Sequence, residues 1–181
     1  MAYEPFPERF PTLHGSGLEL RALSEEDLPA WFARMMDEES ARLAGDPVAS
    51  SMAQVEEALE YHRGAFRQKA GIRWAIVPAS PGNSIGSVGI SGLDPEERTA
   101  DLGAVLGRAS WGQGFAGRAA QLVLDYGFSA LELRTIRAVV LPENFRSLNG
   151  LRRLGFRSGE CPEELALPGR PDSVLFTASN D

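Results

Sequence analysis

The chain contains few of the residues on which several common kinds of site depend. Among its 181 residues there is one cysteine, Cys161, and there are two histidines, His14 and His62. A single cysteine excludes an internal disulfide and a zinc site built from several thiolates. Cys161 is also far in sequence from both histidines, which argues against a cysteine nucleophile with a histidine base. We therefore expect neither a metal ion nor a covalent enzyme intermediate.

Long apolar stretches and positive charge are also scarce. No uninterrupted apolar run approaches the roughly 20 residues that span a bilayer. Residues 1–11 lack the basic, then apolar, then small pattern of a secretory signal. The formal net charge of −7 argues against general nucleic-acid binding. The sequence therefore predicts a cytoplasmic protein that contacts neither a membrane nor nucleic acid.

The residues that are present predict one α/β domain with a mixed sheet flanked by helices. The length of 181 residues and the 43% of hydrophobic residues suit a single unit, residues 1–181, with its core at about residues 13–178. Capping residues and helical periodicity predict helices at 24–37, 51–66, 116–131 and 147–154. Short apolar runs between turn residues, such as the turn at 78–83, predict strands at 18–20, 73–76, 85–90, 99–106, 136–141 and 174–177.

The sharpest feature is a glycine-rich turn between a predicted strand and a long helix. It reads Trp111-Gly112-Gln113-Gly114-Phe115-Ala116-Gly117-Arg118. Small residues let the backbone approach a phosphate, and the unpaired amides of the first helical turn point at its oxygens, aided by the helix dipole. The segment from residue 108 to residue 157 also holds eight arginines against three acids, a local charge of +5. These features predict a site for a small polyanion.

The turn alone leaves alternatives open. Gly112, Gly114 and Gly117 spell G-x-G-x-x-G, the dinucleotide-binding fingerprint, with Glu143 as a possible ribose ligand. Antiparallel-looking strands before the turn, and too short a chain after it, argue against an NAD(P)-dependent oxidoreductase of this kind. A glycine-rich loop without any ligand is the other alternative.

A second motif begins about thirty residues downstream of the turn. It runs from Pro142-Glu143-Asn144 through Ser147 to Leu154-Gly155-Phe156. Together the two segments resemble the GNAT N-acetyltransferase superfamily, particularly its branch of ribosomal-protein-type N-terminal acetyltransferases. In that branch W-G-x-G-[YF]-A precedes a helix, and a sequence like P-E-N-x-x-S-x-x-x-[LM]-x-x-L-G-F follows. The resemblance extends from about Leu18 to Phe176 and thus covers nearly the whole domain.

The resemblance implies a fold and a cosubstrate, acetyl-CoA. It implies a sheet that splays between the strands Ala100–Leu106 and Ile136–Leu141, with the pantetheine arm of acetyl-CoA in the gap. It assigns the pyrophosphate to the backbone amides of the glycine-rich turn. The implied cofactor-binding residues are Leu106, Trp111, Gly112, Gln113, Gly114, Phe115, Ala116, Gly117, Arg118 and Asn144. Arg118 departs from the acid common at its position, and it is either a further phosphate contact or an outward-facing surface arginine.

Direct acetyl transfer needs a neutral amine, a donor for the oxyanion and a proton source for the leaving thiolate. Ser147 matches the family serine near the sulfur, and the alternative is that it caps the helix that begins there. Asp101 replaces a glutamate often found in relatives and could accept a proton through water, or be an ordinary strand carboxylate. The tyrosine that many members place after the asparagine is missing, so oxyanion stabilisation falls to a backbone amide near Leu106. His14 and His62 lie outside the motifs and receive no role.

The sequence therefore predicts an N-acetyltransferase that moves the acetyl group of acetyl-CoA directly onto a primary amine. The acceptor is a protein or peptide α-amine or a small-molecule amine, and the two early helices are expected to recognise it. Acidic residues on those helices make a cationic acceptor an option. A non-catalytic acyl-CoA-binding module stays open as the alternative function, and the resemblance also suggests a homodimer.

Overall fold

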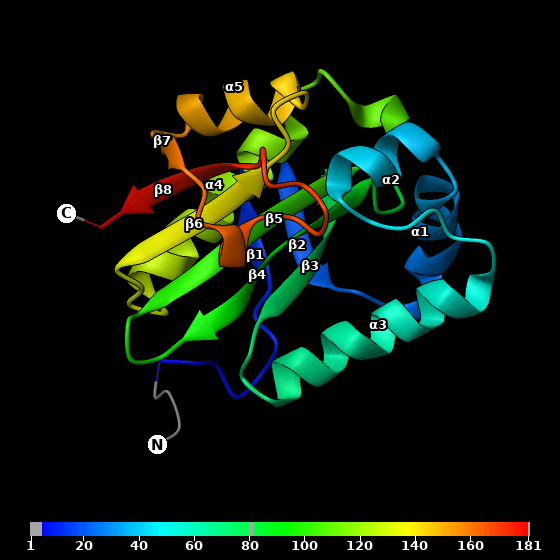
Figure 1. The fold of residues 1–181 in the computed structure, drawn as a ribbon. Coiled ribbons are helices and arrows are strands. Elements are labelled where there is room, and N and C mark those ends of the chain that lie inside the picture. The colour runs from blue at the N-terminus through cyan, green and yellow to red at the C-terminus, as the bar shows by residue number, and fades with distance from the viewer. Residues whose placement is uncertain (1–4, 80–81, 181) are drawn as a thin grey trace.

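The computed structural model describes residues 5–79 and 82–180, which form one mixed sheet with helices on both faces (Figure 1). The strands, which follow the order β1-β2-β3-β4-β5-β6-β8-β7 across the sheet, are β1 (Leu13–Gly15), β2 (Leu18–Ala22), β3 (Ile72–Pro78), β4 (Gly86–Asp94), β5 (Thr99–Leu106), β6 (Thr135–Val140), β7 (Arg157–Glu160) and β8 (Val174–Ser179). The α-helices are α1 (Leu28–Met35), α2 (Glu38–Ala44), α3 (Met52–Arg67), α4 (Phe115–Ser129) and α5 (Phe145–Arg153). Short 3-10 turns lie at Glu25–Asp27, Arg108–Ser110 and Glu163–Leu165.

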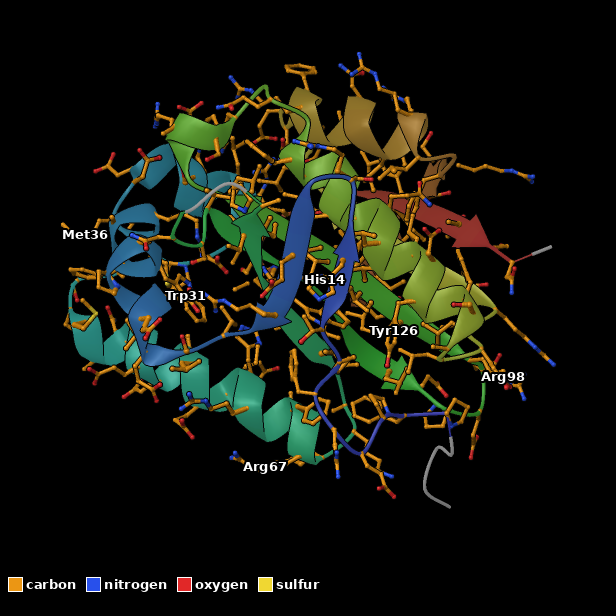
Figure 2. All side chains as sticks on the ribbon, turned by 180° about the vertical axis from the view of Figure 1, so that it is seen from behind. His14, Trp31, Met36, Arg67, Arg98 and Tyr126 are labelled. Carbon is orange, nitrogen blue, oxygen red and sulfur yellow. The ribbon has the colours of Figure 1, made fainter. Side chains whose placement is uncertain are left out.

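The two faces of the sheet are covered by different helices. Side chains of a strand alternate between faces, so Trp74 and Ile76 of β3 join the large core under α4, whereas Ala75 joins a smaller cluster under α1 and α3. Helix α4 lies behind the sheet in Figure 1 and in front of it in Figure 2. Within the described ranges, no helix combines the length and apolar character that a bilayer crossing requires.

The sheet opens between β5 and β6. Strand β5 pairs with antiparallel β4 as far as Leu106, but it pairs with parallel β6 only over residues 99–101. Strand β6 continues its pairing with β8 to Val140. Beyond Asp101 the two central strands therefore diverge, and their facing edges lack a ladder partner there. This confirms the splay predicted between residues 100–106 and 136–141, and with it the predicted GNAT-like mixed sheet.

Most predicted elements are present, and the differences have local causes. The helix predicted at 24–37 is present as the 3-10 turn Glu25–Asp27 followed by α1. Helix α2 was not predicted: Asp37 adopts an extended conformation, and its side chain accepts a hydrogen bond from the Ser40 amide at 2.8 Å, which starts this second helix. Helix α3 begins with the predicted capping box of Ser51 and Gln54. The short edge strands β1 and β7 were not predicted, because three residues in one and four exposed residues in the other carry no apolar alternation. In the predicted turn at 78–83, residues 80–81 lie outside the described residues.

A glycine on β4 tests how tightly the strands beside the opening are packed. A Cβ added at Gly86 would overlap the carbonyl oxygen of Val105 on β5, and this backbone atom cannot move aside without disturbing the ladder. We expect Gly86→Ala to lower the free energy of unfolding in urea by about 1–3 kcal/mol, the usual cost of overpacking. Gly150→Ala in α5 is the control: a Cβ there meets nothing within 4 Å, so stability should hold or rise by about 0.5–1 kcal/mol. Equal stability of the two variants would contradict the packing described.

Candidate active site

A cavity of about 860 Å³ occupies the opening between β5 and β6. It is enclosed by the ends of those strands, by the first turns of α4 and α5, and by side chains of α1, α2 and α3. The predicted site residues that line it are Leu106, Trp111, Gly112, Gly114, Phe115, Ala116, Gly117, Arg118, Asn144 and Ser147. Two segments that are about thirty residues apart in sequence thus meet in one place.

The glycine-rich turn is shaped to leave backbone amides accessible. Gly112 and Gly114 have φ angles of 76° and 75°, a left-handed conformation that side chains disfavour. Gly114 is the N-cap of α4, so the first helical turn has no side-chain cap. A Cβ at Gly112, Gly114 or Gly117 would meet nothing within 4 Å. Packing therefore does not explain these glycines, whereas an anion approaching the uncapped amides does.

Two arginines, Arg118 and Arg146, add positive charge to this end of the cavity, and a third, Arg153, also lines the cavity. Arg118 donates to the Ser16 carbonyl at 2.7 Å and lies over the Phe115 ring at 4.7 Å, so it is held in place rather than facing freely outward. Arg146 lies over the ring of Trp111 at 4.6 Å. With the uncapped helix terminus, these side chains suit a ligand with several negative charges, such as the phosphates of acetyl-CoA.

Asn144 and Ser147 enter the cavity from the start of α5. Asn144, rather than Ser147, caps this helix: its Oδ1 atom accepts from the Ser147 amide at 3.2 Å, and its amide group donates to the Leu43 carbonyl at 3.3 Å. The alternative that Ser147 is the cap is therefore wrong. Within residues 5–79 and 82–180 the Ser147 hydroxyl has no hydrogen-bond partner, so it is available to a ligand.

Two predicted residues lie outside the cavity lining. Asp101 occupies the last register pair between β5 and β6, where its Oδ1 atom accepts from Nε of Arg137 at 2.8 Å. This cross-strand ion pair gives the carboxylate a structural explanation. Gln113 is exposed and donates to the carbonyl of Ala109 at 2.9 Å. The geometry therefore brings ten of the twelve predicted residues together and leaves Asp101 and Gln113 apart from them.

Helix α2 connects the two strands that diverge. At its N-terminus Asp37 accepts two hydrogen bonds, at 3.0 and 2.8 Å, from Arg108, which follows β5. At its C-terminus Arg42 donates to Glu143, which follows β6, at 2.9 Å. The carboxylate of Glu143 also accepts two hydrogen bonds from the guanidinium of Arg170. These two hydrogen bonds are the main reason that the pKa of Glu143 is lowered to about 2. Glu143 is thus engaged within the protein, which removes the ribose ligand that the dinucleotide-binding alternative requires.

Sequence reasoning expected the two early helices to recognise the acceptor, but it assigned no role to Arg34, His62 or Arg73 at the other end of the cavity. Trp31 and Arg34 of α1, His62 of α3 and Arg73 of β3 all line it. The rings of Trp31 and His62 stack with centroids 5.8 Å apart. Burial, and next the charges of Arg73 and Arg34, lower the pKa of His62 to about 4, so this imidazole is neutral at pH 7. Helical spacing in the sequence could have identified two of these residues. Trp31 lies three residues after the buried Leu28 in α1, and His62 lies three residues after the buried Leu59 in α3, so each is on the buried face of its helix.

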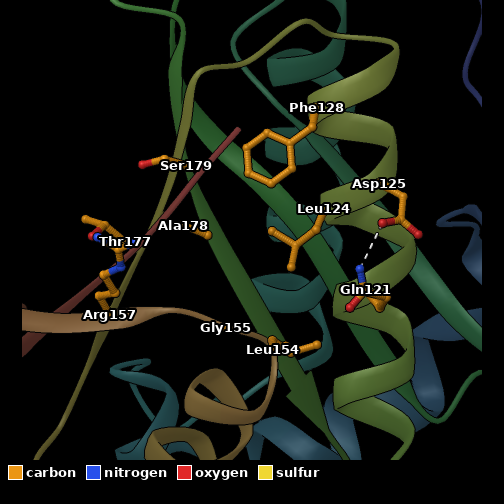
Figure 3. Close-up of a pocket in the computed structure, with 10 residues that line it drawn as sticks. All are labelled: Gln121, Leu124, Asp125, Phe128, Leu154, Gly155, Arg157, Thr177, Ala178 and Ser179. Atoms are coloured by element: carbon orange, nitrogen blue, oxygen red, sulfur yellow. Dashed lines mark hydrogen bonds between the residues drawn. The ribbon is translucent and has the colours of Figure 1, made fainter. Parts of the chain in front are cut away.

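A second, smaller pocket contains none of the predicted residues. It measures about 250 Å³ and lies between α4, the end of α5 and β8 (Figure 3). Its polar side chains Gln121 and Asp125 hydrogen-bond each other at 2.8 Å. Among the described residues, no group of three or more His, Cys, Asp or Glu side chains could hold a metal ion. The larger cavity is therefore the candidate active site.

Comparison with known proteins agrees with this geometry. Residues 17–157 match the family model described as the acetyltransferase (GNAT) domain. The N-acetyltransferase YoaA of Bacillus subtilis is 33% identical over 148 residues, which cover 82% of this chain and 84% of that relative. The structure of spermidine N-acetyltransferase from Vibrio cholerae, in complex with CoA and spermine, superposes with a TM-score of 0.77 at 25% identity and covers 91% of this chain and 96% of that one. The ribosomal L7/L12 alpha-N-protein acetyltransferase RimL, in complex with coenzyme A, shares the fold with a TM-score of 0.79 at 18% identity, over 94% and 99% of the two chains.

The chain belongs to the GNAT acetyltransferase family and is an acetyl-CoA-dependent N-acetyltransferase. The resemblance found in the two motifs is thereby confirmed at the level of the superfamily. Membership of the ribosomal-protein branch stays a prediction, because the likeness to RimL at 18% identity concerns the fold.

The environment of His62 generates a pH-dependent stability. The native state disfavours protonation of this ring, whereas the unfolded chain binds a proton below about pH 6.5; stability is therefore full above pH 6.5 and is lost as the pH falls toward 4. The loss amounts to at most about 3 kcal/mol. Urea denaturation at pH 7 and pH 4.5 should show a smaller pH-dependent loss for His62→Asn than for the wild type. His14→Asn, at an exposed site, should keep the wild-type loss, and an unchanged loss in His62→Asn would disprove the assignment.

Proposed function

We propose that this enzyme transfers the acetyl group of acetyl-CoA directly to a primary amine, either a protein or peptide α-amine or the amine of a small molecule. The diphosphate binds the backbone amides of residues 112–117, and the pantetheine arm runs from there into the opening between β5 and β6. The observation that carries this proposal is the uncapped, glycine-lined start of α4 at the mouth of the splayed strands. Leu106 and Asn144, which line the same cavity, contact the cofactor in this arrangement.

The reaction requires no covalent intermediate on the protein. The lone pair of the neutral amine attacks the thioester carbonyl carbon, a C–N bond forms, and the C–S bond breaks. One amine proton leaves the nitrogen and one proton reaches the CoA sulfur, so the products are an amide and CoA thiol. An N-terminal amine has an ordinary pKa of about 7.7–8.0, against about 10.4 for lysine. A substantial minority of α-amines is therefore neutral near pH 7, and a weak base or solvent suffices to accept the proton.

Backbone and side chain share the stabilisation of charge in this mechanism. The β5 edge beyond Asp101 has no ladder partner, so an amide near Leu106 can donate to the developing oxyanion. The Ser147 hydroxyl, which lines the cavity without a partner among the described residues, donates to the departing thiolate. Asp101 is not carried forward as a base, because Arg137 holds its carboxylate outside the cavity.

The two earlier alternatives make different predictions in simple measurements. A non-catalytic acyl-CoA-binding module would release no CoA with any amine, whereas the proposed enzyme releases CoA in proportion to amide formed. An NAD(P)-dependent oxidoreductase would be stabilised against heat by NAD or NADP rather than by acetyl-CoA.

A cytoplasmic location and a homodimer stay predictions.

Gly117 offers a way to block the phosphate site without straining the fold. A Cβ there meets nothing within 4 Å in the free protein, so Gly117→Val should fold normally while its side chain fills space that the diphosphate needs. We expect the Kd for acetyl-CoA, measured by calorimetry, to rise at least tenfold, which corresponds to about 1.4 kcal/mol. The control is Gly64→Val in α3, which is outside the cavity and where a Cβ makes only ordinary contact with Arg67. Equal affinity in both variants would place the phosphates elsewhere.

Ser147→Ala tests the proposed donor to the thiolate. Loss of a hydrogen bond made mainly in the transition state should lower kcat by about tenfold to a hundredfold and leave the Kd for acetyl-CoA unchanged. Steady-state CoA release and calorimetry give the two quantities. Ser129→Ala is the matched control, since that hydroxyl donates to the Asp125 carbonyl on the exposed side of α4. A kcat equal to that of the control variant would remove Ser147 from the mechanism.

A further inference from the structure

Arg34 of α1 is buried in the cavity wall with an incomplete set of partners. It is 7% exposed, and its Nη1 atom has no hydrogen-bond partner among the described residues. The acid nearest to this atom is Asp46, whose Oδ2 lies 3.9 Å away, beyond hydrogen-bond distance. Asp46 itself is 42% exposed, so solvent weakens this pairing. Arg34 thus lines the cavity with a charge that Asp46 neutralises only in part.

A second arginine, Arg73, reaches the same cavity by lying across the sheet. It is in register with Gly89 of β4, which is in register with Gly103 of β5. A Cβ at Gly89 would stand 2.9 Å from Cδ of Arg73, and one at Gly103 would stand 3.2 Å from its Nη1. The lack of a side chain at Gly103 thus leaves room for the Arg73 guanidinium, whereas at Gly89 a Cβ would first overlap the backbone carbonyl oxygen of Ile72. Arg73 ends at the carbonyl of Gly103, 3.2 Å from Nη1, two residues beyond the last β5–β6 pair.

The hydrogen-bond partners of Arg73 are neutral. Its Nε atom donates to the Ser87 hydroxyl at 3.1 Å, and the other acceptor is the Gly103 carbonyl. Burial, and next the charge of Arg34, lowers the pKa of Arg73 to about 10, so the group still carries its charge at pH 7. The imidazole of His62 beside these arginines is neutral. Arg34 is buried and Arg73 is half-buried, and Asp46 compensates their charge only in part. Like charges withdrawn from water in this way are destabilising unless a ligand supplies further negative charge.

The whole cavity lining likewise has more positive than negative side chains. Its arginines are Arg34, Arg73, Arg118, Arg146 and Arg153, and its single acid among the described lining residues is Asp46. Arg118 and Arg146 stand over aromatic rings of the glycine-rich turn, beside the proposed phosphate site. Arg34 and Arg73 lie at the acceptor end. Glu56, Glu57 and Glu60 of α3, which made a cationic acceptor an option, are exposed and do not line the cavity.

We propose, on the basis of the proposed function, that the acceptor is a primary amine that also carries a carboxylate, and that Arg34 and Arg73 bind this carboxylate. Guanidinium groups suit carboxylates because their N–H donors match the two oxygens. Arg73 ends where β5 and β6 meet, at the deep end of the opening into which the pantetheine points. A carboxylate held there places the attached amine next to the thioester. A polyamine such as spermidine would instead bring positive charge against two arginines without full compensation.

The test compares amino acids with their α-amides, which lack only the negative charge of the carboxylate. Glycine, alanine and glutamate are assayed with acetyl-CoA against their α-amides, with spermidine as the polycation, by CoA release. We expect kcat/KM to be at least tenfold higher for each amino acid than for its amide or for spermidine. Equal values for the amino acids and their amides would overturn the carboxylate site while leaving the acetyltransferase function intact.

Variants at Arg34 separate ligand binding from a structural role. Arg34→Gln should raise KM for the amino acids at least tenfold, leave the amides unchanged and keep or raise the melting temperature, because an incompletely compensated buried charge is removed. Arg34→Lys should restore part of the preference. Arg67→Gln, at the exposed end of α3 (Figure 2), is the control and should behave as wild type. A lower melting temperature together with an equal loss for all acceptors would show a structural role and overturn the proposal.

A binding measurement keeps the proposal testable without turnover. In the presence of CoA, N-acetylalanine should raise the melting temperature of the wild type, whereas N-acetylalanine amide should not, and neither should stabilise Arg34→Gln. If no amine is acetylated but this pattern appears, the carboxylate site stands and the proposed reaction fails. If N-acetylalanine and its amide behave alike in the wild type, the carboxylate site is refuted.

Discussion

The early end of pairing between β5 and β6 is the constraint on which the site depends. After Asp101 the two strands separate, although each stays fully paired on its other side with β4 or β8. The Asp101–Arg137 ion pair lies at the last shared register position and closes the apex of the opening. Helix α2 holds the two diverging strands at their far ends, through Arg108 after β5 and Glu143 after β6. The cavity is thus a gap between paired strands, and an extended ligand can lie along the unpaired edges.

The two ends of this gap present hydrogen-bond donors in different ways. At the outer end the backbone supplies the donors, because Gly114 leaves the start of α4 without a side-chain cap. At the inner end the buried Arg34 and the half-buried Arg73 supply them, and the lack of a side chain at Gly103 leaves room for the Arg73 guanidinium. Both arrangements leave polar groups incompletely satisfied in the free protein. Such groups cost stability and persist where a ligand satisfies them.

Local signals made much of the fold and the outer end of the site predictable. The turn and the Pro142–Ser147 motif identified residues that line the outer end of the cavity, since uncapped amides and left-handed glycines are properties of a short segment. Helix α2 was missed because its seven residues follow the first helix closely, and Asp37 at the end of one helix does not by itself show that it caps the next. The path of Arg73 could not be predicted, because it depends on the register of three strands. The partner of Asp101 likewise comes from a strand 36 residues away in sequence.

The most direct test of this account is a crystal structure of the protein with acetyl-CoA. The account predicts the diphosphate on the amides of residues 112–117 and the pantetheine arm between β5 and β6, with the thioester pointing toward Gly103. Electron density for the nucleotide at any other place, or a pantetheine arm outside the opening, would contradict it.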